Sequence, residues 1–137
     1  MISKKLIIAA TICNNEQIVK DIFLNIKKLG TKFSETRLII IESNSYDNTI
    51  KAVQENKSLL GDIKLTFYSL GDLNYETRME KISKSRNFYL DIVEEEFSDY
   101  DYLYVLDFNE TNVEPYNIAS ILSNFEIEED WSMVCAN

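Results

Sequence analysis

The sequence predicts an α/β fold in which a mostly parallel sheet is flanked by helices. Four short apolar runs rich in β-branched and aromatic residues recur along the chain, at 6–12, 38–41, 65–70 and 102–108. The first two runs are continuous rather than alternating, which is typical of strands covered on both faces. Longer segments with helical spacing separate the runs, and this alternation favours parallel strands joined by right-handed crossovers.

Helical periodicity and end signals define the first two predicted helices. In the segment 16–29, an apolar stripe recurs every three or four residues, and Gly30 follows as a C′ stop. The segment 46–60 opens after Ser45, a good N-cap residue, and ends before Gly61.

The second half of the chain predicts one long helix and one short one. The segment 76–97 places an apolar stripe on one face, formed by Met79, Ile82, Tyr89, Val93 and Phe97. Pro115 stands where the first turn of a short helix is expected, and 131–135 is typical of the start of another strand. The sequence contains no internal repeat or low-complexity linker, so we expect one domain over residues 1–137.

Composition and charge exclude several classes of protein. With 45% hydrophobic and 27% charged residues the chain is an ordinary globular domain. Its net charge of −9 repels a phosphate backbone, so nucleic acid is not an expected partner. No apolar segment approaches the length of a membrane span. The sequence has no histidine, which removes His-based nucleophile systems and His-based zinc sites.

The start of the chain and its two cysteines bear on localisation. The apolar run at 6–12 superficially resembles a signal peptide but lacks a small-residue cleavage site, so we expect a buried strand there. Cys13 and Cys135 sit in apolar runs without metal-ligand spacing, where a free thiol behaves as a small hydrophobe. A reducing, cytoplasmic location is the expectation.

Polar clusters follow three of the predicted strands, at 13–15, 42–45 and 107–110. In a parallel sheet, ligands collect beyond the carboxyl ends of the strands, where the strand order reverses. Neither a Gly-x-Gly-x-x-Gly sequence nor a Gly-rich loop ending in Lys-Ser or Lys-Thr occurs, which disfavours dinucleotide oxidoreductases and P-loop enzymes. The negative charge of a bound diphosphate would then have to be met by another group, and a divalent cation held by oxygen ligands is the first candidate.

Asp107 and Asn109 are the candidate cation ligands. They follow a predicted strand one residue apart, so both side chains face one side while Phe108 turns inward. Capping of the next helix by either residue is an equally open alternative.

Glu42 and Arg86 are the other candidate ligand contacts. Glu42 leaves a buried strand, where it can accept hydrogen bonds from a ribose or base edge, while Ser45, Asp47 and Thr49 are better explained as caps. Arg86 falls on the apolar stripe of the third helix, and a guanidinium there needs a phosphate or a carboxylate partner. Pairing with Asp107 is the structural alternative.

These segments resemble the A-type glycosyltransferases, particularly family 2-like enzymes and the fungal capsular mannosyltransferase-like group. The resemblance rests on residues 41–49, on Arg78 with 82–87, and on 104–109. It implies a nucleotide-diphospho-sugar transferase-like fold and a divalent metal, manganese or magnesium, held at Asp107 and Asn109. The nucleotide-sugar-binding residues that follow from it and from the reasoning above are Asn14, Glu42, Ser43, Arg78, Arg86 and Asp107.

Two departures from the family qualify this function. Asn109 stands where the family's metal motif has its second carboxylate, so the site has one charge fewer. In the family, the acceptor site and the catalytic carboxylate of inverting members lie downstream of that motif, so we expect the donor-binding half of a transferase. Its partners would be a nucleoside-diphosphate sugar and a glycan or protein acceptor. A non-catalytic nucleotide-binding module and an interaction domain are the alternatives.

Overall fold

A four-stranded parallel sheet forms the centre of the computed structural model, which describes residues 1–127 and 131–134. The strands lie in the order β3-β2-β1-β4, and every pair is parallel. They are β1 (Ile2–Ile12), β2 (Phe33–Glu42), β3 (Lys64–Ser69) and β4 (Tyr102–Asp107). The predicted α/β fold with a helix-flanked parallel sheet is confirmed.

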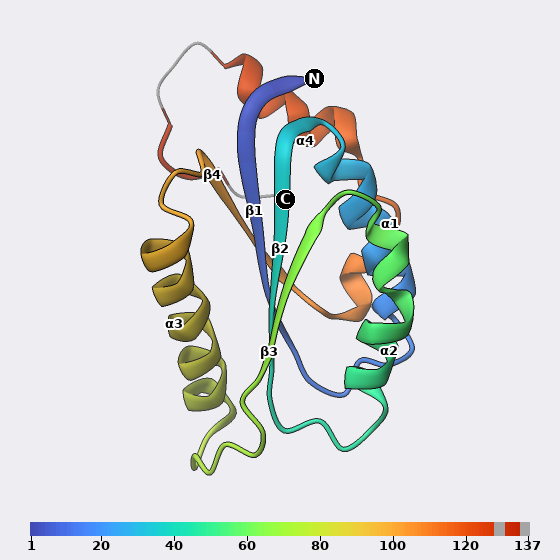
Figure 1. Cartoon of the computed structure of the whole chain (residues 1–137), viewed down its shortest axis with the longest axis vertical. Helices are drawn as coiled ribbons and strands as arrows, with labels where there is room; N and C mark the ends of the chain where they lie inside the picture. The colour runs from blue at the N-terminus through green and yellow to red at the C-terminus, as the bar shows by residue number, and fades with distance from the viewer. Residues whose placement is uncertain (128–130, 135–137) are drawn as a thin grey trace.

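Helices cover both faces of this sheet. They are α1 (Val19–Gly30), α2 (Thr49–Asn56), α3 (Arg78–Glu96) and α4 (Ile118–Ser123), with short 3₁₀ turns η1 (Lys57–Leu60), η2 (Glu110–Asn112) and η3 (Asn124–Glu126). The first two helices and α4 lie on one face and α3 on the other (Figure 1). No helix in the described residues is both long enough and apolar enough to cross a membrane.

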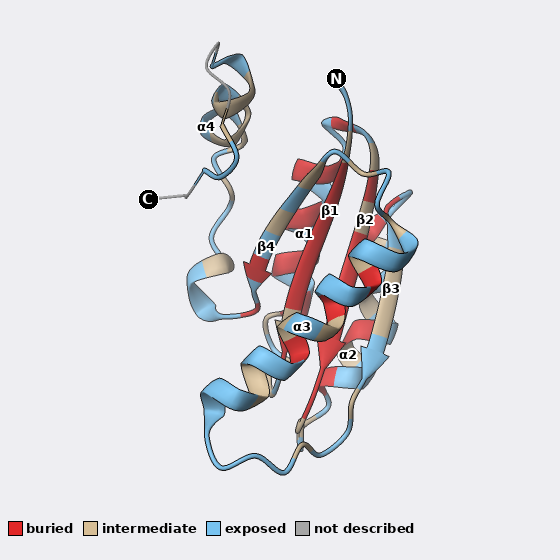
Figure 2. Cartoon of the chain, turned by 90° about the vertical axis from the view of Figure 1, so that its left-hand side faces the viewer, coloured by how far each residue is buried: buried red, intermediate tan, exposed pale blue. Residues whose placement is uncertain are grey.

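Alternation along β1 divides the hydrophobic core between the two faces. Leu6, Ile8 and Ala10 pack with α1, whereas Ile7 and Ala9 pack with Tyr89 and Ile92 of α3. Because both faces are covered, the two middle strands are buried over most of their length, as Figure 2 shows in red. This explains the continuous apolar runs in the sequence.

The predicted apolar face of α3 is only partly correct. Met79 is 67% exposed, and the buried positions are Ser85, Tyr89 and Ile92. Only the second half of α3 packs on the sheet, while its first turns extend beyond it and stay exposed (Figure 2). Hydrophobic spacing alone does not reveal where a helix leaves its sheet.

Gly30 has a packing role rather than the predicted C′ role. It is the last residue of α1, and a Cβ atom there would lie 2.5 Å from Cδ1 of Ile63. Glycine therefore allows the end of α1 to approach the segment that leads into β3.

Three further sequence expectations are corrected at the chain's loops and end. Pro115 precedes the last helix instead of entering its first turn, since Asn117 is the N-cap residue and accepts a hydrogen bond from the Ser120 N–H at 3.1 Å. Residues 131–134 form no strand, and Trp131 stacks on Tyr102 with ring centroids 5.6 Å apart. Cys135 lies outside the described residues. Cys13 is exposed rather than buried in an apolar run.

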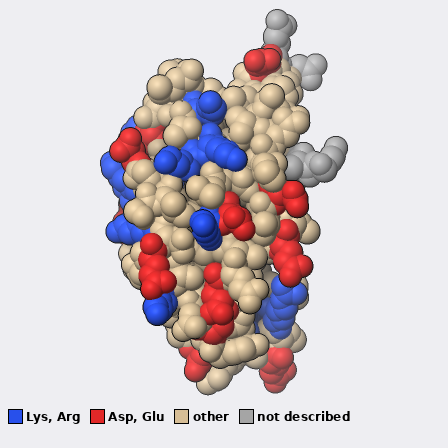
Figure 3. Space-filling model, turned by 90° about the vertical axis from the view of Figure 1, so that its right-hand side faces the viewer, with Lys and Arg blue, Asp and Glu red and all other residues tan. Residues whose placement is uncertain are grey.

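Surface charge is mixed on the face formed by α1 and α2. Acidic and basic side chains are interspersed there (Figure 3), so the net charge of −9 does not gather into one acidic patch on that face. This is the arrangement of an ordinary solvated surface.

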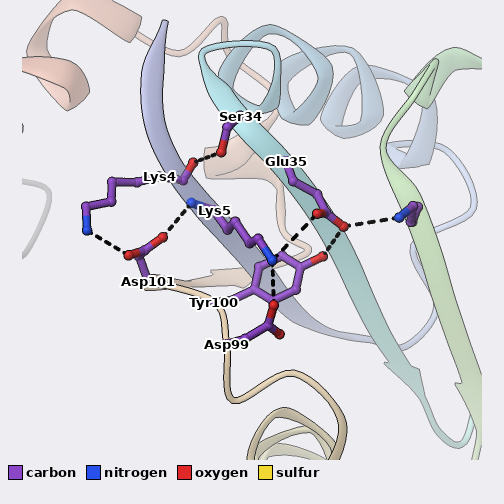
Figure 4. Close-up of polar contacts among 8 residues, drawn as sticks. Lys4, Lys5, Ser34, Glu35, Asp99, Tyr100 and Asp101 are labelled. Carbon is purple, nitrogen blue, oxygen red and sulfur yellow. Dashed lines mark hydrogen bonds and ion pairs between the residues drawn. The ribbon is translucent and has the colours of Figure 1, made fainter.

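An ion-pair network joins the amino end of the sheet to the α3–β4 turn (Figure 4). Lys4 contacts Asp101 at 2.9 Å, and the Tyr100 hydroxyl donates to Glu35 at 2.7 Å. Lys64 reaches the same Glu35 carboxylate at 3.1 Å. The hydrogen bond from Tyr100, followed by that from Lys64, lowers the pKa of Glu35 below its ordinary value.

The network predicts a loss of stability at acid pH. A carboxyl whose pKa is lowered by folding stabilises the folded state fully above its unfolded pKa and loses that contribution as the pH falls through the folded pKa. We expect Glu35→Gln to lower the urea midpoint at pH 7 and to converge with the unsubstituted chain near pH 3. Urea titrations from pH 3 to 7 measure this, and a constant difference over that range would contradict it.

Candidate functional site

A cleft of about 560 Å³ opens at the carboxyl ends of the strands, next to β1 and β4. The strand order reverses at this point, because the chain moves from β1 outward to β2 and β3 and then returns to place β4 on the other side of β1. The cleft is lined by the ends of β1 and β4, by the loops that follow β1 and β2, and by the first turns of α3. This is the edge and the switch point at which the sequence predicts a ligand.

Hydrogen bonds join the loop after β1 to the loop after β2. The Asn14 N–H donates to Oγ of Ser45 at 3.2 Å, and Oδ1 of Asn14 accepts from the Tyr46 N–H at 2.9 Å. The Asn15 N–H donates to Oγ1 of Thr49 at 2.7 Å. These contacts hold the two loops as one wall of the cleft.

Two residues of this wall adopt left-handed backbone conformations. Asn14 has φ 52° and Asn44 has φ 56°. Asparagine tolerates this region better than most side chains do, and such conformations cluster at functional sites. Asn44 also ties in the loop after β3, since its N–H donates to the Gly71 carbonyl at 2.9 Å and its Oδ1 accepts from the Leu73 N–H at 3.2 Å.

Glu42 is at the predicted edge but does not line the cleft. Its side chain is 1% exposed, and its carboxylate accepts hydrogen bonds from the Ser45 N–H at 2.9 Å and from the Ser69 hydroxyl. Glu42 therefore supports the loop from below, whereas the neighbouring Ser43 lines the cleft itself. The expected contact of Glu42 with a ribose or base is replaced by contacts within the protein.

The start of α2 corrects the expected N-cap. Asn48 is the N-cap residue rather than Ser45, and Oδ1 of Asp47 accepts from the Thr49 N–H at 2.9 Å. Ser45 instead accepts from Asn14. Of the three residues interpreted as caps, Asp47 caps the local turn. Ser45 and Thr49 instead accept hydrogen bonds from the loop after β1.

The first turns of α3 bring two cations to the cleft. A capping box starts the helix, in which Oγ1 of Thr77 accepts from the Glu80 N–H at 3.2 Å and Glu80 accepts from the Thr77 N–H at 3.0 Å. Arg78 and Lys81 follow on the side that lines the cleft. Sequence reasoning named Arg78 and missed Lys81, although three-residue spacing places the two on one helical face.

Asp107 lines the cleft and is paired with Arg86. One guanidinium nitrogen, Nη2, lies 3.1 Å and 3.3 Å from the two carboxylate oxygens. Both side chains are partly exposed, at 41% for Arg86 and 49% for Asp107. Arg86 itself does not line the cleft. Arg86 is therefore paired with Asp107, which is the structural alternative given above for this residue.

Asn109 is the N-cap of η2. Its Oδ1 accepts hydrogen bonds from the Thr111 N–H at 3.1 Å, the Thr111 hydroxyl at 2.5 Å and the Asn112 amide at 3.1 Å. With three donors around this oxygen, Asn109 and Asp107 do not fit a shared cation in this arrangement. Among the described residues, no group of three or more Asp, Glu or Cys side chains is placed to hold a metal ion.

Two buried residues fix the position of the segment after β4. Phe108 turns inward, as predicted, and packs edge-on against Phe23 of α1 with ring centroids 6.2 Å apart. Asn25 of α1 is buried and donates from its amide to three consecutive backbone carbonyls at 112–114, at 2.8–3.2 Å. The sequence offers no signal for this contact, because its partners are backbone atoms almost ninety residues away.

The thiol of Cys13 lines the cleft but is not activated. Desolvation, followed by the charge of Glu42, raises its pKa above the ordinary value. It therefore remains protonated near pH 7, and thiolate chemistry is not indicated.

No protein-family model matches the chain, and no curated protein matches it either. Inference about function therefore depends on the cleft. Its described lining combines amide and hydroxyl groups on one wall with the cations Arg78 and Lys81 on the other. Two carboxylates also line it, Glu76, which is exposed, and Asp107, which is paired with Arg86. Because one carboxylate is already paired, the cleft suits a polar, anionic small molecule.

The structural role of Glu42 predicts a stability defect. Glu42→Ala leaves the Ser45 N–H and the Ser69 hydroxyl without their acceptor, so we expect the free energy of unfolding to fall by about 1–3 kcal/mol. Glu42→Gln keeps one acceptor oxygen, and its loss should be smaller. Urea denaturation measures both variants, and unchanged stability in Glu42→Ala would return Glu42 to the candidate ligand contacts.

Proposed function

We propose that the cleft binds the nucleoside diphosphate of an activated sugar, as the donor site of a glycosyltransferase. The observation that carries the proposal is the pairing, at the switch point of a parallel sheet, of an uncharged polar wall with the cationic side chains Arg78 and Lys81. Its volume of about 560 Å³ is within the usual size of small-molecule sites.

Each part of the cleft suits one part of such a donor. Asn14 and Ser43 line the wall with an amide and a hydroxyl group, which suit ribose hydroxyls and base edges, whereas the Asn44 amide is bonded to the backbone of Leu73. Tyr46 lines the same side and is 90% exposed, so its ring is free to stack on a base. The two cations of α3 face the opposite side, where they would meet the phosphates.

The proposal includes no cation at Asp107 and Asn109, because the Asn109 oxygen is already engaged by three donors. The negative charge of a diphosphate leaving group is instead assigned to Arg78 and Lys81. The two side chains are three residues apart and lie on one helical face.

Nucleotide affinity tests the proposed site. Arg78→Ala should weaken nucleoside diphosphate binding about tenfold, since one charge-assisted contact is lost. Lys84→Ala is the matched control, because Lys84 is exposed on the same helix and does not line the cleft. Calorimetric titration with the diphosphates of uridine, guanosine, cytidine, thymidine and adenosine measures this, and no binding by any of the five would sink the proposal.

A non-catalytic nucleotide-binding module is the second candidate, and the Arg86–Asp107 ion pair favours it. That pair engages Asp107, one of the two carboxylates that line the cleft, while the other, Glu76, is exposed. A glycosyltransferase needs a group that activates the acceptor, and the Asp107 carboxylate is already engaged by Arg86.

Turnover distinguishes the two candidates. A donor site of a transferase should release nucleoside diphosphate from a bound nucleotide sugar when acceptors are supplied, whereas a binding module should hold the sugar intact. Chromatography after incubation separates nucleoside diphosphate from intact nucleotide sugar and therefore measures which of the two results occurs. Tight binding without release, over a broad panel of acceptors, would favour the binding module.

A further inference from the structure

We infer that this cleft binds a nucleoside diphosphate without a divalent cation, with side chains of α3 supplying the positive charge. The inference rests on the proposed function and departs from the metal that the glycosyltransferase resemblance implies. It is carried by the hydrogen bonds of Asn109, the ion pair of Asp107 and the position of Lys81.

The first step concerns Asn109. An amide oxygen has two lone pairs, and Oδ1 of Asn109 already has three donors within 3.1 Å. These bonds begin η2, and Asn112 further donates to the Asp107 carbonyl at 2.8 Å. A cation bound to this oxygen would have to displace the contacts that shape the segment after β4.

The second step concerns Asp107. Both of its carboxylate oxygens face Nη2 of Arg86, at 3.1 Å and 3.3 Å. A divalent cation would compete with a guanidinium that is covalently part of the fold and is held at Asp107 at no translational cost. Arg86 therefore takes the place of the metal as the partner of this carboxylate, and the negative charge of Asp107 is neutralised before any ligand arrives.

The third step concerns the charge that meets the ligand. Arg78 and Lys81 line the cleft within the first two turns of the 19-residue helix α3. The amino end of a helix also carries partial positive charge, which adds to that of the two side chains. Of the two carboxylates that line the cleft, Asp107 is paired with Arg86 and Glu76 is exposed, so Arg78, Lys81 and the helix end oppose the phosphates without a metal between them.

The test is calorimetric titration of the full chain with the five nucleoside diphosphates, in a chelating buffer and again with manganese. We expect the dissociation constant to agree within about twofold between the two buffers. Lys81→Ala should weaken binding about tenfold in the chelating buffer, and Lys81→Arg should retain it. Lys84→Ala, again the control, should match the unsubstituted chain.

Asp107→Asn should change nucleotide affinity in opposite directions, depending on whether the site binds with or without a metal. Without a metal, removing a negative charge near the phosphates should leave affinity unchanged or increase it up to tenfold, whereas a metal site would lose its charged ligand and bind more than tenfold weaker. Circular dichroism confirms folding, which a half-exposed side chain should not disturb.

The outcomes separate this inference from the function on which it rests. Binding that weakens more than tenfold on chelation, or with Asp107→Asn, would overturn metal independence and leave the nucleotide site in place. Binding of none of the diphosphates in either buffer would overturn both.

Discussion

The position of β1 in the sheet is the constraint on which the rest of the structure depends. It pairs with β2 through the crossover of α1 on one face and with β4 after the crossover of α3 on the other. Since the two connections leave in opposite directions, neither covers the carboxyl end of β1. The cleft opens there, beside a strand that is buried on both faces.

The polar residues around this cleft divide into those engaged within the protein and those free to meet a ligand. The carboxylate of Glu42, the Asn109 oxygen and the Asp107–Arg86 pair all have partners inside the fold. Arg78, Lys81, Glu76 and the exposed ring of Tyr46 line the cleft. The chemistry available for recognition is therefore cationic and aromatic more than it is carboxylate-based.

This division reconciles an acidic chain with an anionic ligand. The net charge of −9 disfavours nucleic acid, because its long phosphate backbone interacts with the charge of a large part of the surface. A nucleoside diphosphate samples only the cleft, where two cations lie on one helical turn. Local potential, rather than total charge, decides binding of a small anion.

The sequence by itself determined the order of strands and helices through the last helix, the parallel sheet, the edge at which the cleft opens and the inward turn of Phe108. These depend on hydrophobic period, on strand ends and on β-α alternation, all of which are local. The exact helix starts near Ser45 and Pro115 were less accurate, because neighbouring polar residues compete for the same cap.

Only the tertiary structure decided what each polar side chain at that edge does. Glu42 is buried because Ser69, twenty-seven residues away, lies beside it on β3, and Arg86 meets Asp107 across twenty-one residues. Lys81 reaches the cleft because the first turns of α3 extend beyond the sheet. A sequence shows which residues can bond, but the partner that a buried polar group finds depends on the packing of distant segments.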